Sequence, residues 1–143
     1  MSPAQRKELS AASAEEMRRL GAQLAQELRP GDCVVLIGEL GVGKTTFVQG
    51  LAQGLGVAEP VRSPTFILMR EYRGKVPLYH FDAYRIKNLD ELREIGFEET
   101  VRSQGITVIE WGEKAAGLLP DGCWRVFFEL LPDQSRRVTI ERP

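Results

Sequence analysis

Apolar and polar residues recur with two different periods along the chain, and the change of period separates predicted strands from predicted helices. Continuous apolar, β-branched runs at 33–37 and 106–109 predict buried strands. Apolar positions at helical spacing predict amphipathic helices within 13–28 and 47–55, and residues 13–16 resemble a capping box at the start of the first helix. The strand–helix–strand order indicates a parallel pair in a sheet that helices cover.

Shorter apolar runs predict two antiparallel hairpins, which make the sheet mixed rather than purely parallel. The first joins residues 67–72 to 77–81 through a Gly-containing turn, and the second joins 123–131 to 137–141. We expect residues 1–12, which carry little pattern, to be loose. Short helices are expected over residues 88–95, 97–102 and 113–119.

The connection from the first strand into the next helix has the spacing of a phosphate-binding P-loop, Gly38-Glu39-Leu40-Gly41-Val42-Gly43-Lys44-Thr45. Its glycines allow successive N–H groups to turn toward phosphate oxygens, and the helix N-terminus favours an anion. Lys44 can reach the β- and γ-phosphates, and the Thr45 hydroxyl can hold Mg²⁺. Because the flanking strand and helix occur in the required order, we expect the chain to bind a nucleoside triphosphate.

Length, charge and cysteine usage narrow the class of protein. The chain has 143 residues and a net charge of −1, which predicts one domain over 1–143 and no basic stripe for direct nucleic-acid binding. Cys33 and Cys123 have no metal-ligand spacing, and Cys33 is expected to be a small buried hydrophobe. The sequence has no apolar signal segment and no membrane-length apolar run, so we expect a soluble cytoplasmic protein.

Glu110 follows the second buried strand, where P-loop proteins place an acid near Mg²⁺. The residue is Glu rather than the usual Asp, and the alternative is a surface carboxylate that merely ends the strand. We favour the metal role because the strand otherwise has no acid at its tip.

Three further polar residues each have a chemical and a structural interpretation. Thr65 could sense the γ-phosphate from a switch loop, or its loop could simply turn into the hairpin. Asp82 could orient the attacking water or support the metal through a water, or it could form a turn. His80 is the single histidine, and we favour a structural hydrogen-bonding role for it.

The base is expected to be adenine. Lys87-Asn88-Leu89-Asp90 departs from a guanine-binding motif, because its first two residues are in the wrong order and no clear strand precedes it. ATP is therefore the expected nucleotide by elimination.

Four sequence blocks together resemble the TsaE (YjeE) family, small bacterial P-loop ATPases needed for threonylcarbamoyl-adenosine modification of tRNA. The blocks are residues 38–46, 63–66, 80–85 and 109–111. Their order and spacing are specific to the family, and the resemblance runs from about Ser13 to Arg136. It implies an α/β P-loop NTPase fold, with a mixed central sheet of parallel core strands and hairpins flanked by helices.

The resemblance also implies roles for the residues of catalysis and metal binding. Thr45 and Glu110 would coordinate Mg²⁺, and Asp82 would help to place Mg²⁺ or water. Thr65 would be the threonine of the switch loop, acting with Lys44 on the γ-phosphate.

The resemblance also implies which residues surround the nucleotide. Trp111 would pack beside the nucleotide site or a partner surface, and Ala14 and Arg136 would lie near adenine. Two positions depart from the family: Glu39 replaces a usual Asp, and Met17 replaces a frequent Thr. The phosphates would be held by the loop residues Gly41, Val42, Gly43, Lys44, Thr45 and Thr46.

In that family the ATPase is an accessory subunit that binds the TsaD–TsaB heterodimer, with ATP at the contact, and reaches tRNA through these partners. Hydrolysis would permit multiple rounds of threonylcarbamoyl transfer by TsaD. We expect weak turnover by the isolated chain, because no arginine finger is evident and such a residue is worth about 10³- to 10⁵-fold.

Two alternatives belong to other functional classes. A free-standing small-molecule P-loop kinase would need an acceptor pocket and usually a lid, and the sequence has no insertion long enough for a lid. A nucleotide-gated binding module would bind ATP with only incidental hydrolysis.

Overall fold

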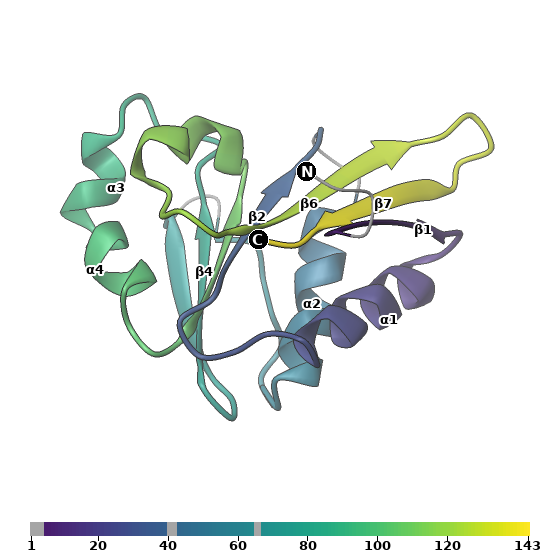
Figure 1. The fold of residues 1–143 in the computed structure, drawn as a ribbon, viewed down its shortest axis with the longest axis horizontal. Helices are drawn as coiled ribbons and strands as arrows, with labels where there is room; N and C mark the ends of the chain where they lie inside the picture. Colours follow the sequence, from purple (N-terminus) through teal and green to yellow (C-terminus); the bar gives the residue numbers. More distant parts are fainter. Residues whose placement is uncertain (1–4, 40–42, 65–66) are drawn as a thin grey trace.

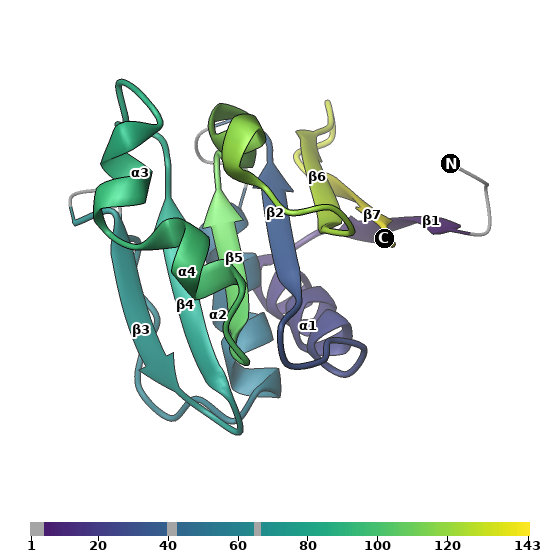
Figure 2. The same ribbon diagram turned by 60° about the vertical axis from the view of Figure 1, so that its left-hand side comes forward.

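The computed structural model describes residues 5–39, 43–64 and 67–143, which form a twisted seven-stranded sheet with helices on both faces (Figures 1 and 2). The strand order is β1-β7-β6-β2-β5-β4-β3. The inner strands β6, β2, β5 and β4 are parallel, and the remaining pairs are antiparallel. The strands are β1 (Arg6–Ala11), β2 (Cys33–Ile37), β3 (Met69–Arg73), β4 (Pro77–Asp82), β5 (Ile106–Glu110), β6 (Trp124–Leu130) and β7 (Arg136–Glu141).

The helices divide the core into two halves. The pair α1 and α2 covers one face of the sheet, and the shorter helices cover the other (Figure 2). Side chains of β4 alternate between the halves: Leu78 packs on the α1–α2 side and Phe81 on the other. The helices are α1 (Ala14–Ala25), α2 (Lys44–Gly54), α3 (Asp90–Glu94), α4 (Phe97–Val101) and the 3₁₀ helix η2 (Gly112–Leu118).

The predicted mixed sheet with parallel core strands and hairpins is confirmed, and one expectation is wrong. Residues 6–11 are not loose, because they form β1 and pair with β7 along the whole strand. Leu9 packs against the core and Ala11 is buried, whereas the outward positions are polar. An edge strand with so few inward apolar residues leaves almost no alternation in the sequence.

Two glycines bring α1 and α2 into close contact and so position the start of α2. A Cβ on Gly50 would lie 1.8 Å from the Arg18 carbonyl oxygen, and one on Gly21 would lie 2.1 Å from the Phe47 carbonyl oxygen. The two backbones therefore touch where any side chain would separate them. At the N-terminus of α1, the Ser13 hydroxyl accepts from the Glu16 amide at 3.1 Å, as the predicted capping box requires.

The polar residues of the predicted site meet at the carboxyl ends of the parallel strands. The loop after β2 leads into α2, Asp82 ends β4, and Glu110 ends β5 beside it in the register. Ligands of open α/β sheets bind at this edge. None of the helices formed by the described residues is long and apolar enough to cross a bilayer.

Candidate nucleotide and metal site

The site is built around the N-terminus of α2, which Gly43 caps. Gly43 has φ +102°, a left-handed conformation that favours glycine. A Cβ there would also lie 3.1 Å from Cε of Met17, so α1 comes close to the loop at this point. Gly41 and Val42 of the predicted phosphate loop lie outside the described residues.

Lys44 is buried at the first position of α2, and its ammonium group has two partners. Its Nζ donates to the Gly38 carbonyl at 2.5 Å and lies 3.6 Å from the centroid of the Trp111 ring. Burial lowers the pKa of Lys44 from its usual value, and the carboxylates of Glu110, Glu113 and Asp82 oppose that shift. The lysine is thus held as a partly desolvated cation beside the loop.

Thr45 and Glu110 come together from α2 and the end of β5. The Thr45 hydroxyl lies 3.1 Å from Oε2 and 3.3 Å from Oε1 of Glu110. Glu110 is 4% exposed, so it is not the surface carboxylate of the alternative interpretation. A hydroxyl and a carboxylate within hydrogen-bonding distance are close enough to share one cation.

The same carboxylate has a second partner on the neighbouring strand. His80 Nε2 lies 2.6 Å from Glu110 Oε2, and the imidazole is completely buried. The prediction that His80 is a hydrogen-bonding residue is confirmed. The sequence did not identify Glu110 as the partner of His80. The available signal was that His80 lies two residues before Asp82, because alternate residues of a strand share a face.

Asp82 ends β4 next to Glu110 in the β4–β5 register and is 2% exposed. Its Oδ1 accepts from the Tyr84 amide at 2.9 Å. The carboxylate therefore does shape the following turn, and it remains at the strand edge where a metal or water role was predicted. Lys114 joins this turn by donating to the Tyr84 carbonyl at 2.5 Å, a contact without any signal in the sequence.

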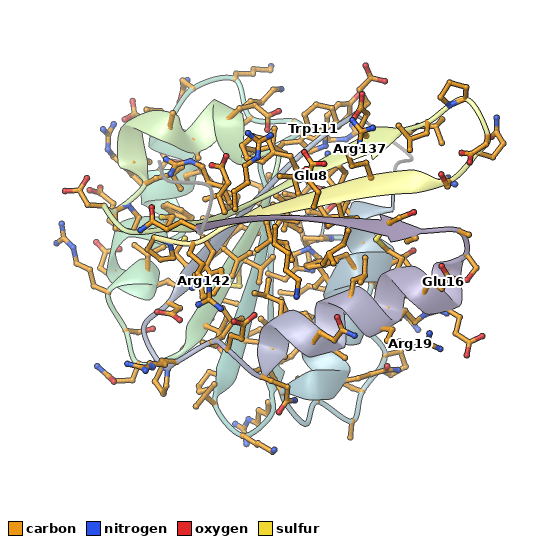
Figure 3. The ribbon with its side chains drawn as sticks, turned by 45° about the vertical axis from the view of Figure 1, so that its right-hand side comes forward. Glu8, Glu16, Arg19, Trp111, Arg137 and Arg142 are labelled. Carbon is orange, nitrogen blue, oxygen red and sulfur yellow. The ribbon has the colours of Figure 1, made fainter. Side chains whose placement is uncertain are left out.

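Trp111 lies directly after Glu110, and Figure 3 shows it on the other side of β7 and β1 from α1. Its backbone is in the left-handed region, with φ 59° and ψ 40°, which is rare for a bulky residue. The indole contacts Lys44 on one side and the Tyr84 ring on another, with ring centroids 4.9 Å apart. Trp111 was expected beside the nucleotide site or a partner surface, and its contact with Lys44 puts the indole next to the first residue of α2.

A small cavity of about 180 Å³ lies beside the loop, between α1 and the start of β7. It gathers Ala14 and Arg136, the residues expected near adenine, from opposite ends of the chain. Arg136 Nη1 donates to the Gln134 carbonyl at 2.6 Å, which directs the guanidinium toward its own hairpin. The cavity is lined by Ala11, Ser13, Ala14, Met17, Gly43, Thr46 and Arg136.

The predicted residues are thus largely assembled. Lys44, Thr45, Asp82 and Glu110 meet at one edge of the sheet, and Ala14, Thr46 and Arg136 lie around the adjacent cavity. Thr65, the predicted switch threonine, lies outside the described residues.

The chemistry of the assembled donors suits Mg²⁺. Hydroxyl and carboxylate oxygens are the hard ligands this ion prefers, and it is commonly held by one or two carboxylates together with phosphates and waters. Within residues 5–39, 43–64 and 67–143, no cluster of three or more His, Cys, Asp and Glu forms a protein-only metal cage. Thr45 and Glu110, with Asp82 beside them, are the residues that would hold this ion.

Both cysteines are buried and free, and for Cys33 this agrees with the expected small buried hydrophobe. Cys123 Sγ donates to the Pro120 carbonyl at 3.0 Å. A hydrogen bond with Cys123, together with burial, raises the pKa of the Cys33 thiol.

Comparisons with known proteins agree with this geometry. The family model described as threonylcarbamoyl adenosine biosynthesis protein TsaE matches residues 11–138. A tRNA threonylcarbamoyladenosine biosynthesis protein TsaE from Treponema pallidum is 43% identical over 128 residues, 90% of this chain and 95% of the relative. The protein of the same name from Streptomyces coelicolor is 48% identical, over 87% of this chain and 88% of its own.

A solved structure shares the fold. The crystal structure of YdiB from Bacillus subtilis superposes with a TM-score of 0.83 at 30% sequence identity. The match covers 96% of this chain and 85% of that one.

Proposed function

The chain belongs to the TsaE family of threonylcarbamoyl adenosine biosynthesis proteins, and we propose that it serves this pathway as a Mg²⁺-dependent ATPase. Its role is that of TsaE in tRNA threonylcarbamoyladenosine biosynthesis. The reaction would be the hydrolysis of ATP to ADP and phosphate in the cytoplasm.

The observation that carries the proposal is the contact between Thr45 and Glu110. These residues are 65 positions apart in the sequence, yet the hydroxyl and the carboxylate lie 3.1 Å apart. Lys44 adds a cation one residue before Thr45 at the mouth of the phosphate loop. Hydroxyl, carboxylate and lysine are the three side-chain functions that P-loop NTPases direct at Mg²⁺ and the β/γ-phosphates.

Each residue then has a defined task. Lys44 would exchange the Gly38 carbonyl for phosphate oxygens, and Thr45 and Glu110 would hold Mg²⁺. When bound, Mg²⁺ neutralises charge on the β- and γ-phosphate oxygens. Asp82 would orient the water that attacks the γ-phosphorus, as the bond to the β–γ bridging oxygen breaks. Ala14 and Arg136 would contact adenine, and Thr65 would respond to the γ-phosphate.

The proposed protein partner is the TsaD–TsaB heterodimer. A net charge of −1 supports a chain that reaches tRNA through partners, because direct phosphate binding relies on clustered Lys and Arg. Association in the ATP-bound state would place the accessory subunit on the complex, and hydrolysis would release it for another round of threonylcarbamoyl transfer.

Phosphate release measured with and without purified TsaD–TsaB tests the proposal. We expect slow turnover by the chain alone, faster turnover in the complex, and none with Lys44→Ala. The matched control is Lys75→Ala, which removes an exposed lysine from the β3–β4 turn at the opposite end of β4.

The other functional classes give different results in the same assay. Transfer of the γ-phosphate to a metabolite without partners would indicate the kinase, which the family comparisons do not favour. ATP-dependent association with retained function in Glu110→Ala would indicate a binding module whose hydrolysis is incidental. Either result would contradict the ATPase proposal.

A further inference from the structure

The single histidine of the chain is placed on the side of the sheet that faces α2. His80 is paired with Val108 across the β4–β5 register, and Asp82 with Glu110 two residues on. Because alternate residues share a face, the His80 imidazole and the Glu110 carboxylate lie on the same side and one step apart. Val108 packs in the core half under α1 and α2, which identifies that side.

The Glu110 carboxylate therefore accepts hydrogen bonds from residues of two different elements. His80 Nε2 lies 2.6 Å from Oε2 on the β4 side, and the Thr45 hydroxyl lies 3.1 Å from the same oxygen on the α2 side. A carboxylate only accepts, so Nε2 carries the proton in this bond. Two donors from different directions leave the carboxylate little freedom to rotate.

The hydrogen bond from Nε2 to Glu110 is the chief polar interaction of the buried His80 imidazole, because the second ring nitrogen makes none within the part of the chain that the structure describes. Nδ1 of His80 has no hydrogen-bond partner among the described residues, and the side chain is 0% exposed. A buried polar atom without a partner is unfavourable, and an apolar side chain would avoid that cost. A purely space-filling role does not explain why a histidine occupies this position.

We propose that His80 is a positioning residue that fixes the Glu110 carboxylate in the orientation required to receive Mg²⁺ with Thr45. This inference rests on the proposed function, because it assigns to His80 a role in the same metal site. Residues that orient a metal ligand typically change metal affinity or activity about 10- to 100-fold when they are replaced. His80 is expected to act through Glu110 and not to touch the nucleotide.

The test compares two polar replacements that differ in where they put a donor. In His80→Gln the amide nitrogen takes roughly the place of Nε2 and can still donate to Glu110. In His80→Asn the amide is shorter, corresponds to Nδ1, and does not reach the carboxylate. Leu78→Val, on the same face of the same strand, removes one buried methylene and controls for lost packing.

The readout is ATP binding by calorimetry at a series of Mg²⁺ concentrations and in EDTA, with thermal unfolding of each variant. We expect His80→Asn to raise the Mg²⁺ concentration for half-maximal enhancement of ATP affinity about tenfold or more. His80→Gln should keep most of the wild-type Mg²⁺ dependence, and ATP binding in EDTA should be unchanged in both His80 variants. Leu78→Val should lower the melting temperature without changing the Mg²⁺ dependence.

A wild-type Mg²⁺ dependence in folded His80→Asn would overturn the proposal and leave His80 a packing residue. If His80→Asn does not fold, His80→Leu replaces it as the variant without a donor, and the same comparison with His80→Gln decides the question. No Mg²⁺ dependence in the wild-type protein would instead refute the proposed function, and this inference with it.

A double variant tests the route through Glu110. If His80 acts by positioning that carboxylate, His80→Asn adds little to the loss of Mg²⁺ dependence already caused by Glu110→Gln. Independent, multiplicative losses would show that His80 acts on the nucleotide site by another path, which would contradict the proposal.

Discussion

The Lys44 ammonium lies 3.6 Å from the centroid of the Trp111 indole, although Lys44 begins α2 and Trp111 follows β5. Trp111 adopts φ 59°, so the surrounding contacts hold a bulky residue in a sparsely populated conformation. A cation over an indole ring gains about 0.5–2 kcal/mol, depending on desolvation. The indole therefore reports directly on the state of the P-loop lysine.

The fluorescence of Trp111 should change when a nucleotide binds, because phosphate oxygens become partners of the cation that faces the ring. Trp124 is the second tryptophan of the chain and lies at the start of β6, beside Arg142. We expect Mg·ATP to shift the emission of Trp124→Phe, in which Trp111 remains, and to leave Trp111→Phe almost unchanged. A signal that comes from Trp124 alone would contradict the assigned contact.

The stability of the ligand-free chain should rise with pH through the range in which Lys44 loses its proton. Burial lowers the pKa of Lys44 in the folded state, so between that value and about 10.5 the unfolded chain binds more protons. Subtracting the free energy of unfolding of Lys44→Met from that of the wild type isolates this contribution.

The free energy of unfolding of the wild type minus that of Lys44→Met should increase as the pH rises from 7 toward 10.5. Lys75→Met, at an exposed position, should show no such trend. A difference that falls over the same interval would mean that burial does not disfavour the Lys44 cation.

Gly50→Ala should destabilise the protein although Ala is the better helix former. The added Cβ would lie 1.8 Å from the Arg18 carbonyl oxygen, so α1 and α2 must move apart. Overpacking of this kind costs about 1–3 kcal/mol, which exceeds the helix-propensity gain of up to about 1 kcal/mol. Chemical denaturation measures the loss, and the exposed Gln53→Ala on the same helix should change stability by less than about 0.5 kcal/mol. A stabilised Gly50→Ala would refute the close approach of the helices.

Removing residues 1–11 should lower stability and weaken nucleotide binding together. The deletion exposes the edge of β7 and removes Ala11 from the cavity that holds Ala14 and Arg136. A control that removes only residues 1–4 keeps the whole of β1. Thermal unfolding and ATP titration of the two truncations decide the matter, and equal behaviour of both would show that β1 is dispensable.

The elements that the sequence predicted well are those whose signals are local. The buried strand before the P-loop, the Ser13 cap of α1 and both hairpins follow from short-range patterns of apolar, capping and turn residues. Glu110 was found because an acid at the tip of an apolar strand is itself a local pattern. Its role as a metal ligand stays a prediction.

Pairings across long sequence distances were the part that could not be predicted. β1 joins β7 through backbone hydrogen bonds that place few demands on its side chains, so residues 6–11 looked unstructured. The bond between His80 and Glu110 depends on the β4–β5 register, which a single sequence does not specify. The contacts of Lys114 with Tyr84 and of Lys44 with Trp111 likewise could not be predicted, because they depend on the paths of the loops that follow the strands.

A calorimetric titration of ATP into the protein tests the proposed nucleotide site directly. The titration is done with Mg²⁺ and with EDTA, on the chain alone and on the chain with TsaD–TsaB. We expect ATP binding that Mg²⁺ strengthens, loss of binding in Lys44→Ala, and loss of only the Mg²⁺-dependent part of the affinity in Glu110→Gln. If the folded wild-type chain binds no Mg·ATP, either alone or with TsaD–TsaB, the proposed site is contradicted.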